Sequence, residues 1–325
     1  MIFTLLRVVV FACLACWGAM AAFAQEAYPS KTVRFIVPWP PGGSADFMPR
    51  LAAQRLTETW GKPVIVENRP GATGTIGTDA VVKAAPDGYT LLVTPSQPLA
   101  IVPALSRVPY DPLKDLTPVV IATEDTNLLV VNPTLGINTV DELIAAAKAN
   151  PKKFTFGSSG VGSVGFLCGE LMKQVAGFDM LHVPYAGAAQ AIAAVVSGEI
   201  SLNFPPVPQA VSLVKAGKVR PLGVTSTRPS QFLPEIQPLS SHQGLEDLVI
   251  ANWYGWYGPQ KMSKSIVQFL RDSLQKVFQD PAIQQKLNGA GLEMRWEEPD
   301  QVRVTMEKDL AKWRKLVEAA HITIN

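Results

Sequence analysis

The sequence is poor in the side chains on which most enzymes and metal sites depend. Its 325 residues include only three histidines and three cysteines. No two of the histidines, His182, His242 and His321, have the spacing of metal ligands on a helix or hairpin. A serine hydrolase needs a nucleophile, a base and an acid, and Gly157-Ser158-Ser159-Gly160-Val161 lacks the last glycine of G-x-S-x-G. We therefore expect no catalytic residues, no metal site and no cofactor.

Charge is also scarce. Charged residues make up 17% of the chain, with 29 Lys and Arg against 27 Asp and Glu. Because no dense run of Lys and Arg occurs, a nucleic-acid partner is not expected. A hydrophobic content of 47% excludes a disordered chain. The length fits two domains of ordinary size.

Long apolar runs are missing after the first 24 residues, so no membrane-spanning segment is expected there. Within them, Arg7 precedes the apolar run 8–20, and Ala22-Phe23-Ala24 has the spacing of a cleavage site. We expect residues 1–24 to be a signal peptide, and the mature protein to be exported and soluble with a net charge of +1. Two cysteines fall in this segment, so Cys168 remains alone and an intramolecular disulfide is excluded.

What the sequence does contain is an alternation of strand, small-residue loop and helix. Runs of β type at 32–37, 62–67 and 90–94 each lead into such a loop and then into a helical pattern. This order predicts βαβ units on a mostly parallel sheet, where ligands bind beyond the carboxyl ends of the strands. The alternation restarts near Leu128, which indicates a second domain. From Ser263 onward the chain is helical in character.

The first of these loops ends at Asp46 and opens a helix. Backbone N–H groups and the positive end of a helix dipole then point at one spot, which suits an anion. Because proline is tolerated in the first turn, Pro49 places the helix start near Asp46 and leaves the amides of Gly43 to Phe47 free. A tight turn without a ligand remains an alternative. Asp46 is either a helix cap or a ligand contact.

The second half has its own glycine loop, Gly160-Val161-Gly162-Ser163-Val164-Gly165. A dinucleotide site would need an acidic residue at the end of the next strand, but Asp179 lies at its start. We therefore expect a second anion-accepting helix N-terminus, with the hydroxyls of Ser158, Ser159 and Ser163 beside it. The aromatic residues at 253–257 are interpreted as packing.

Six motifs follow one another along the mature chain. They are Tyr28-Pro29-Ser30-Lys31, Pro40-Pro41-Gly42-Gly43-Ser44-Ala45-Asp46, Glu67-Asn68-Arg69-Pro70-Gly71-Ala72, Ala85-Pro86-Asp87-Gly88-Tyr89-Thr90, His182-Val183-Pro184-Tyr185 and Val224-Thr225-Ser226. In this order they resemble the Bug-type receptors, the extracytoplasmic solute-binding components of tripartite tricarboxylate transporters. The resemblance covers essentially the whole mature chain.

The resemblance implies an α/β, two-domain periplasmic-binding-protein fold of type II. Its sheets would be mostly parallel, with two crossing strands and a C-terminal helical segment. Domain 1 would comprise residues 25–126 plus 255–325, and domain 2 residues 127–254. The ligand would lie in a cleft between them that closes about a hinge.

In this family the first two loops hold a carboxylate, largely through backbone amides and ordered waters, and the glycine loop of the second domain closes on it. Carried onto this sequence, the resemblance implies a set of ligand-binding residues from both domains. They are Trp39, Pro41, Gly43, Ser44, Ala45, Asp46, Ala72, Thr73, Gly74, Thr75, Ser96, Ser158, Ser159, Gly162, Ser163, Phe166, Tyr185 and Pro205.

Two positions depart from the family pattern. Many relatives have a His shortly after the third loop and an Asp just after the strand that matches 201–204, where this chain has Phe166 and Pro205. The loss of two polar groups argues against a small amino acid as ligand. We hypothesise a carboxylate with an apolar or aromatic body, and a dicarboxylate also fits.

The sequence thus predicts a monomeric periplasmic receptor that captures an organic carboxylate. It would deliver this ligand to the membrane permease subunits of a tripartite tricarboxylate-type transporter. Two alternatives stay open: an α/β enzyme that acts on an acidic small molecule, and a binding protein repurposed for ligand sensing.

Overall fold

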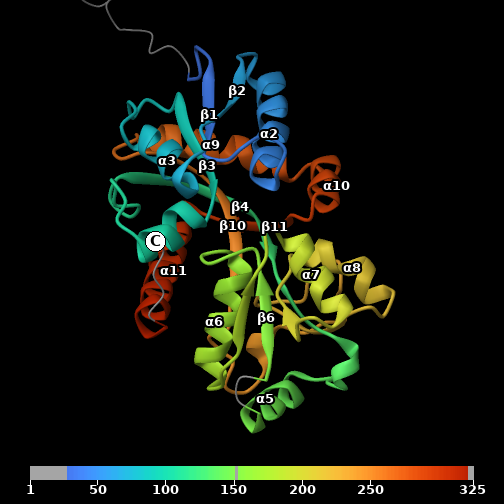
Figure 1. Ribbon diagram of the computed structural model, residues 1–325. Coiled ribbons are helices and arrows are strands. Elements are labelled where there is room, and N and C mark those ends of the chain that lie inside the picture. The colour runs from blue at the N-terminus through green and yellow to red at the C-terminus, as the bar shows by residue number, and fades with distance from the viewer. Residues whose placement is uncertain (1–27, 151–152, 321–325) are drawn as a thin grey trace, which may run out of the picture.

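The computed structural model describes residues 28–150 and 153–320, and the expected signal peptide at 1–24 lies outside them. The chain forms two β-sheets with helices packed around each, one above the other in Figure 1. We call the part built on the six-stranded sheet lobe 1 and the part built on the five-stranded sheet lobe 2. The predicted α/β class is confirmed.

Lobe 1 has the strand order β11-β4-β10-β3-β1-β2. Its strands are β1 Val33–Val37, β2 Val64–Asn68, β3 Thr90–Pro95, β4 Leu116–Thr126, β10 Ala251–Pro259 and β11 Glu293–Glu297. Strands β1, β2 and β3 run parallel, whereas β10 and β11 pair with their neighbours in antiparallel fashion. The loops that follow β1, β2 and β3 therefore gather at one edge of this sheet.

Lobe 2 has the strand order β7-β6-β8-β5-β9. Its strands are β5 Leu128–Val131, β6 Thr155–Ser158, β7 Leu181–Pro184, β8 Leu202–Asn203 and β9 Arg220–Val224. Here β6 runs parallel to β7 and β8, and β5 runs antiparallel to β8 and β9. Both sheets are thus mixed instead of mostly parallel, because the chain enters and leaves each lobe by strands of opposite direction.

The chain crosses between the lobes twice. Only Asn127 separates β4 from β5, and the return segment runs from the end of β9 to the start of β10 at Ala251. The two crossings are tied together where Thr225 N–H donates to the Asn127 carbonyl at 2.9 Å and Asn127 N–H donates to the Thr225 hydroxyl at 3.1 Å. The two expected crossing segments are therefore present and lie side by side.

Successive strand residues point to opposite faces of the sheet, and different helices cover each face. In lobe 1, Phe35 packs with α2, α9 and α10, while its neighbour Ile36 packs with α3 and α11. The helices are α2 Ser44–Trp60, α3 Thr75–Val82, α4 Val102–Leu105, α5 Val140–Ala149, α6 Val164–Ala176, α7 Ala188–Ser197, α8 Val207–Lys215, α9 Lys264–Phe278, α10 Pro281–Gly289 and α11 Pro299–Ala319, with short turns η1 Ala72–Gly74, η2 Gln97–Ile101, η3 Pro133–Leu135 and η4 Leu239–Ser241.

The C-terminal segment is helical as expected, with α9, α10 and α11, but it also contains one strand that the sequence pattern did not indicate. Strand β11, Glu293–Glu297, lies between α10 and α11 and closes the edge of the lobe 1 sheet. Helix α11 packs on β4 in lobe 1 and on α6 in lobe 2. Among the helices in the described ranges, none is both long and apolar enough to cross a membrane.

Candidate functional site

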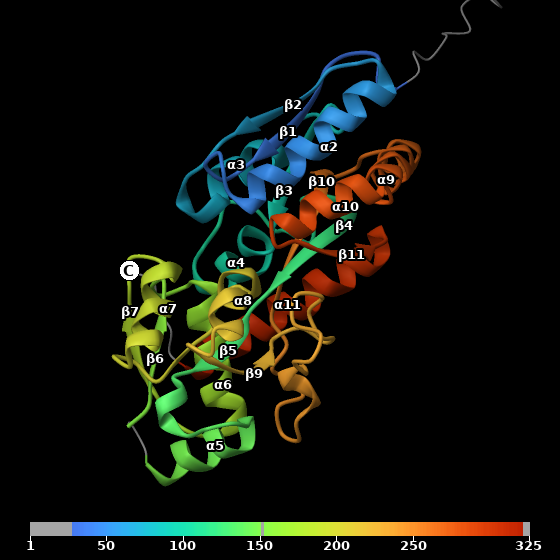
Figure 2. The ribbon, with the colours of Figure 1, turned by 90° about the vertical axis from the view of Figure 1, so that its right-hand side faces the viewer.

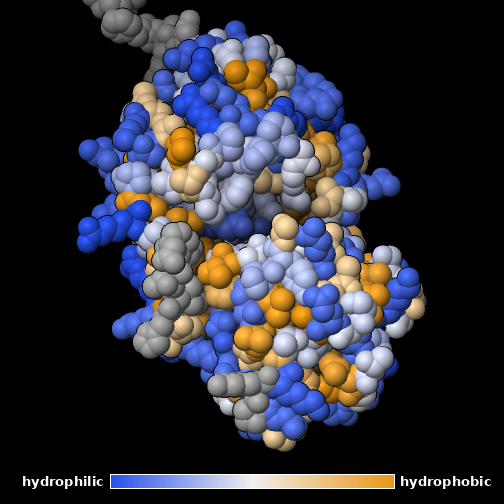
Figure 3. Space-filling model, in the orientation of Figure 1, coloured by the Kyte–Doolittle hydropathy of each residue, from blue (hydrophilic) through white to orange (hydrophobic). Residues whose placement is uncertain are grey.

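A pocket of about 220 Å³ lies where the two lobes meet. Figure 3 shows the surface hollowed between the upper and lower lobes. The lining comes from the crossing segments, β8, the loop after β6 and three helix starts. It consists of Gln97, Asp125, Asn127, Ser158, Ser159, Ser163, Val164, Gly165, Ala188, Ala191, Asn203, Phe204, Pro205, Pro206 and Asn252. Larger hollows of about 580 to 590 Å³ lie in grooves beside α9 and α11, away from the carboxyl ends of β1 to β3.

Three helices of lobe 2 begin at this pocket. Helix α6 is capped by Ser163, whose hydroxyl accepts the Phe166 N–H at 3.3 Å. The next two amides, of Val164 and Gly165, have no acceptor within the part of the chain that the structure describes. Helix α7 starts at Ala188 and α8 directly after Pro206, and both residues line the pocket. Converging helix N-termini favour a bound anion.

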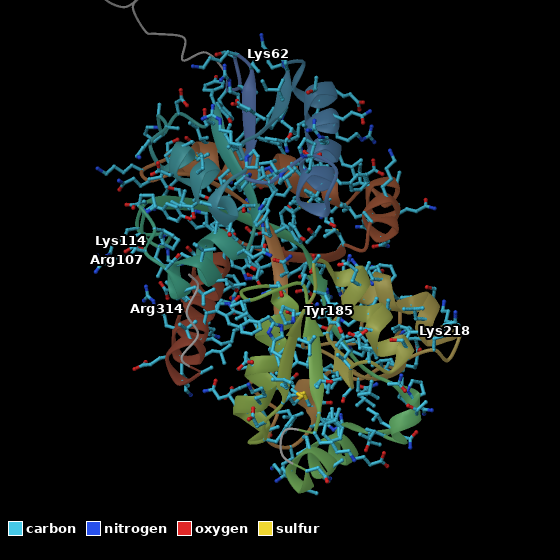
Figure 4. All side chains as sticks on the ribbon, viewed as in Figure 1. Lys62, Arg107, Lys114, Tyr185, Lys218 and Arg314 are labelled. Carbon is cyan, nitrogen blue, oxygen red and sulfur yellow. The ribbon has the colours of Figure 1, made fainter. Side chains whose placement is uncertain are left out.

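Basic side chains do not contribute to this environment. The described lining contains no Lys or Arg, and Asp125 is its one charged residue. Figure 4 shows Lys62, Arg107, Lys114 and Lys218 on the outer surface, away from the space between the lobes. The hydrogen-bond donors that the described lining offers to an anion are therefore backbone N–H groups and neutral side chains. Among the described residues, no cluster of three or more His, Cys, Asp and Glu side chains could hold a metal ion.

Asp125 lies on the floor of the pocket, opposite Asn252 in the β4–β10 pairing. Its Oδ2 accepts hydrogen bonds from the Tyr254 hydroxyl at 2.5 Å and from Asn252 Nδ2 at 3.2 Å. The Ser96 hydroxyl in turn donates to Asn252 Oδ1 at 3.1 Å. Burial raises the pKa of Asp125 to about 6, against the lowering effect of these donors.

Ser158 and His182 form a pair that resembles part of a hydrolase site. The Ser158 Oγ lies 2.7 Å from His182 Nε2 and also contacts the Gly160 backbone. His182 is packed between Phe156 and Phe166, and burial, followed by the charge of Lys173, lowers the pKa of His182. Within the described residues no carboxylate bonds to the ring, so the orienting acid of a triad is missing there.

Asp46 fixes the loop after β1. Its Oδ2 accepts from the Gly42 N–H at 3.0 Å and from Arg50 Nε at 2.9 Å, and its Oδ1 accepts from Asn68 Nδ2 at 2.8 Å. Burial raises the pKa of Asp46, but these hydrogen bonds and the charge of Arg50 outweigh it, so that the pKa lies below its ordinary value. The side chain is 4% exposed and is occupied in holding the loop.

Helix α2 begins two residues earlier than predicted. Gly43 is its N-cap, and the N–H groups of Asp46 and Phe47 both donate to the Gly43 carbonyl at 2.9 Å. Pro49 sits in the second turn. Consequently the amides without an acceptor in the described chain are those of Gly43, Ser44 and Ala45, and the expected range from Gly43 to Phe47 was too long by two residues.

The loop after β2 holds two residues in an unusual conformation. Ala72 and Thr73 have φ of 47° and 50°, in the left-handed region that residues with a side chain rarely adopt. Both are exposed, and the Gly74 N–H closes the turn onto the Gly71 carbonyl at 3.0 Å. Such strained residues cluster at ligand sites, where the surrounding structure holds them in place.

The loops after β1, β2 and β3 face the pocket from lobe 1. β3 ends at Pro95, and the next residue, Ser96, contacts Asn252 on the pocket floor. Because β1 and β2 run parallel to β3, their loops lie on the same side. In Figure 2 the carboxyl ends of β1 and β2 point toward lobe 2, on the side where α7 and β7 lie.

The expected ligand-binding residues divide into three groups. The first lines the pocket from lobe 2 and comprises Ser158, Ser159, Ser163 and Pro205, with Gly162 in the same loop. The second lies on the lobe 1 side without lining the pocket and comprises Trp39, Pro41, Gly43, Ser44, Ala45, Asp46, Ala72, Thr73, Gly74 and Thr75, with Ser96 beneath the floor. The third, Phe166 and Tyr185, does not line the pocket.

Phe166 and Tyr185 are used elsewhere. Phe166 lies in the first turn of α6, which Ser163 caps, and is buried against Phe156 and His182. The hydroxyl of Tyr185 donates to Glu199 Oε1 at 2.8 Å, and the residue is labelled at the upper part of lobe 2 in Figure 4. The apolar ligand body that Phe166 suggested therefore has no direct support from its position.

The sequence reasoning missed the amides and the carboxylate of the floor. Gln97, Asp125, Asn127, Asn203 and Asn252 all line the pocket and come from four separate segments. One signal was available, since four of them, Asp125, Asn127, Asn203 and Asn252, are polar residues inside or beside apolar strand patterns. Their meeting depends on the antiparallel pairing of β4 with β10, which the sequence pattern did not reveal.

Two lobes joined by two crossings, with a polar pocket between them, define the class of periplasmic solute-binding proteins. A structure described as a TctC solute-binding protein from Polaromonas, without ligand, has 25% identity and a TM-score of 0.82, over 90% of this chain and 99% of that one. R. palustris Rpa4515 with adipate has 30% identity and a TM-score of 0.72, over 91% and 99%.

The family follows from sequence. The profile described as "Tripartite tricarboxylate transporter family receptor" matches residues 48–322. Protein BugT of Bordetella pertussis is 32% identical over 302 residues, which cover 92% of each chain. The chain belongs to the tripartite tricarboxylate transporter receptor family, and the Bug-type resemblance is confirmed.

Proposed function

We propose that this protein is a periplasmic receptor that captures an organic carboxylate between its lobes and delivers it to the permease subunits of a tripartite tricarboxylate-type transporter. The observation that carries the proposal is a pocket where three helix N-termini meet without a basic side chain in the described lining. Backbone amides are suited to hold a carboxylate there. The adipate bound to the R. palustris relative supports the same ligand class.

The ligand would be clamped from both sides. On the lobe 1 side, the amides of Ser44 and Ala45 and the strained turn at Ala72 and Thr73 would receive a carboxylate. On the lobe 2 side, the loop from Ser158 to Ser163 would close on it. Asp46 would act by positioning the first loop, since its oxygens already accept internal hydrogen bonds.

The two lobes would be the two domains, with residues 25–126 plus 255–325 in one and 127–254 in the other. The single residue between β4 and β5 supports the first boundary. Pairing of β10 with β4 from Ala251 onward favours moving the second boundary to between 250 and 251.

Ligand binding would close the lobes about these crossings. The Polaromonas structure without ligand superimposes better than the adipate complex, with a TM-score of 0.82 against 0.72, although its sequence is less similar. A difference in the angle between similar lobes would account for this order. The arrangement described here would then be the open one.

The receptor would act in the periplasm after removal of the signal peptide, as a monomer and without a chemical step. An enzyme would need a complete catalytic set, and the Ser158–His182 pair lacks an acid in the described chain. Incubation with a carboxylate mixture followed by NMR separates the two functions. A receptor leaves every compound unchanged, and turnover of any one would favour the enzyme.

Titration calorimetry with a panel of mono- and dicarboxylates tests the proposal directly. Ser44→Trp places a bulky side chain at the start of α2 and should reduce carboxylate affinity at least a hundredfold with an unchanged melting temperature. Ser265→Trp is the matched control, because Ser265 is an exposed serine in the first turn of α9. Unchanged affinity in Ser44→Trp would remove the first loop from the site.

A further inference from the structure

Only one oxygen of the Asp125 carboxylate, Oδ2, accepts hydrogen bonds from the described chain. The Tyr254 hydroxyl at 2.5 Å and Asn252 Nδ2 at 3.2 Å both donate to Oδ2, and Ser96 fixes Asn252 from behind. These three partners are 3 to 7% exposed, so the network is rigidly enclosed. The other oxygen, Oδ1, has no donor within the described chain, and Asp125 lines the pocket. Asp125 Oδ1 is therefore a hydrogen-bond acceptor in a fixed position, available to a ligand in the pocket.

Asn203 offers a second unmet group. It is 2% exposed, lines the same pocket from the end of β8, and its Nδ2 has no acceptor in the described residues. Buried amide groups are normally paired. This enclosed donor adds a second polar group beside the pocket whose hydrogen-bonding capacity is unmet within the described chain.

The charge at the floor restricts the ligand further. No Lys or Arg in the described lining balances Asp125, and two carboxylates placed close together in a protein repel each other. The anionic end of a ligand is thus favoured at the helix starts and loops, away from Asp125. The part that reaches Asp125 must donate a hydrogen bond.

We propose, resting on the receptor function above, that Asp125 determines specificity by accepting a hydrogen bond from a hydroxyl or ammonium group on the body of the carboxylate ligand. Unsubstituted carboxylates leave Oδ1 desolvated and unpaired, and a second carboxylate is repelled. The floor network replaces the polar groups absent at Phe166 and Pro205, so the ligand body is polar instead of apolar.

A calorimetric comparison of straight-chain C3 to C8 carboxylates tests this inference. The probes are each parent acid, its hydroxy and amino derivatives, and the dicarboxylate of equal length. For wild type, the tightest donor-bearing member of a series should bind at least tenfold tighter than its parent and its dicarboxylate. Comparing hydroxy with amino derivatives identifies which donor the site accepts.

The matched variants are Asp125→Asn, which keeps the shape, and Asp125→Ala, which removes the acceptor. Both should lose the tenfold preference, because the hydroxy or amino derivative loses its acceptor and the parent acid no longer leaves a carboxylate oxygen unpaired. Asp247→Asn, at an exposed turn, should keep the preference. Retention of the preference in both Asp125 variants, or equal binding of all derivatives by wild type, overturns the inference alone. If no member of the panel binds, the proposed receptor function fails as well.

Discussion

The first prediction concerns how the stability of Asp125→Asn compares with that of wild type as the pH changes. The difference in unfolding free energy should move in favour of the variant between acidic and neutral pH. Burial raises the pKa of Asp125 from 3.8 to about 6. The folded state therefore binds the proton of the Asp125 carboxyl group more tightly than the unfolded state does. The stability that this proton contributes is present below pH 4 and is lost as the pH rises through 6. A pKa shift of this size corresponds to a change of roughly 3 kcal/mol in the free energy of unfolding. Asparagine does not titrate, so Asp125→Asn avoids the loss.

The assay is the melting temperature of both proteins without ligand at pH 4, 5, 6 and 7. Between pH 4 and pH 7, the difference in unfolding free energy should move by roughly 3 kcal/mol in favour of the variant. This is roughly 4 to 5 °C for a chain of 325 residues. The comparison of two proteins at two pH values removes any effect of the substitution on packing that does not depend on pH. Parallel curves for wild type and Asp125→Asn, with Asp247→Asn as control, would refute the reasoning.

Two further predictions concern the lobe 1 loops. Asp46→Ala removes the acceptor of the Gly42 N–H and of Arg50 Nε, and one of the two acceptors of Asn68 Nδ2. Urea denaturation should therefore show a loss of about 2 to 3 kcal/mol in unfolding free energy together with weaker carboxylate binding, and unchanged stability would contradict the role of Asp46. In Gly77→Ala the added Cβ would lie 2.8 Å from both the Arg69 carbonyl oxygen and Pro38 Cβ. We therefore expect a loss of about 1 to 3 kcal/mol in unfolding free energy in the same assay, and at least tenfold weaker carboxylate binding. Wild-type affinity would show that binding does not depend on this close contact between the loops.

Local patterns in the sequence were sufficient for much of the fold. The three strands that precede small-residue loops and the restart of the alternation near Leu128 follow from the strand and helix patterns, and the helix start near Ser163 agrees with its capping hydroxyl. Helix α2 was recognised too, but its start at Ser44 was missed by two residues because its N-cap, Gly43, has no capping side chain. Strand β11 was not recognised although Glu293–Glu297 alternates charged with apolar residues, because it is only five residues long and lies between two helical patterns.

The pocket floor could not be predicted for a different reason. Asp125 and Asn252 are 127 residues apart and meet through the antiparallel pairing of two crossing strands. Nothing in either local pattern specifies that register. The position of Phe166 could not be read from the sequence for the same reason, since only the packing of α6 against β6 places its ring against Phe156 inside lobe 2.

A crystal structure of the protein with the tightest carboxylate from the panel tests the central claim most directly. The account predicts closed lobes, with the carboxylate within hydrogen-bonding distance of the amides of Ser44 and Ala45 or of the turn at Ala72 and Thr73, and with lobe 2 contacts from the loop at Ser158 to Ser163. A carboxylate bound in one of the outer grooves, with the lobes unchanged, would contradict it.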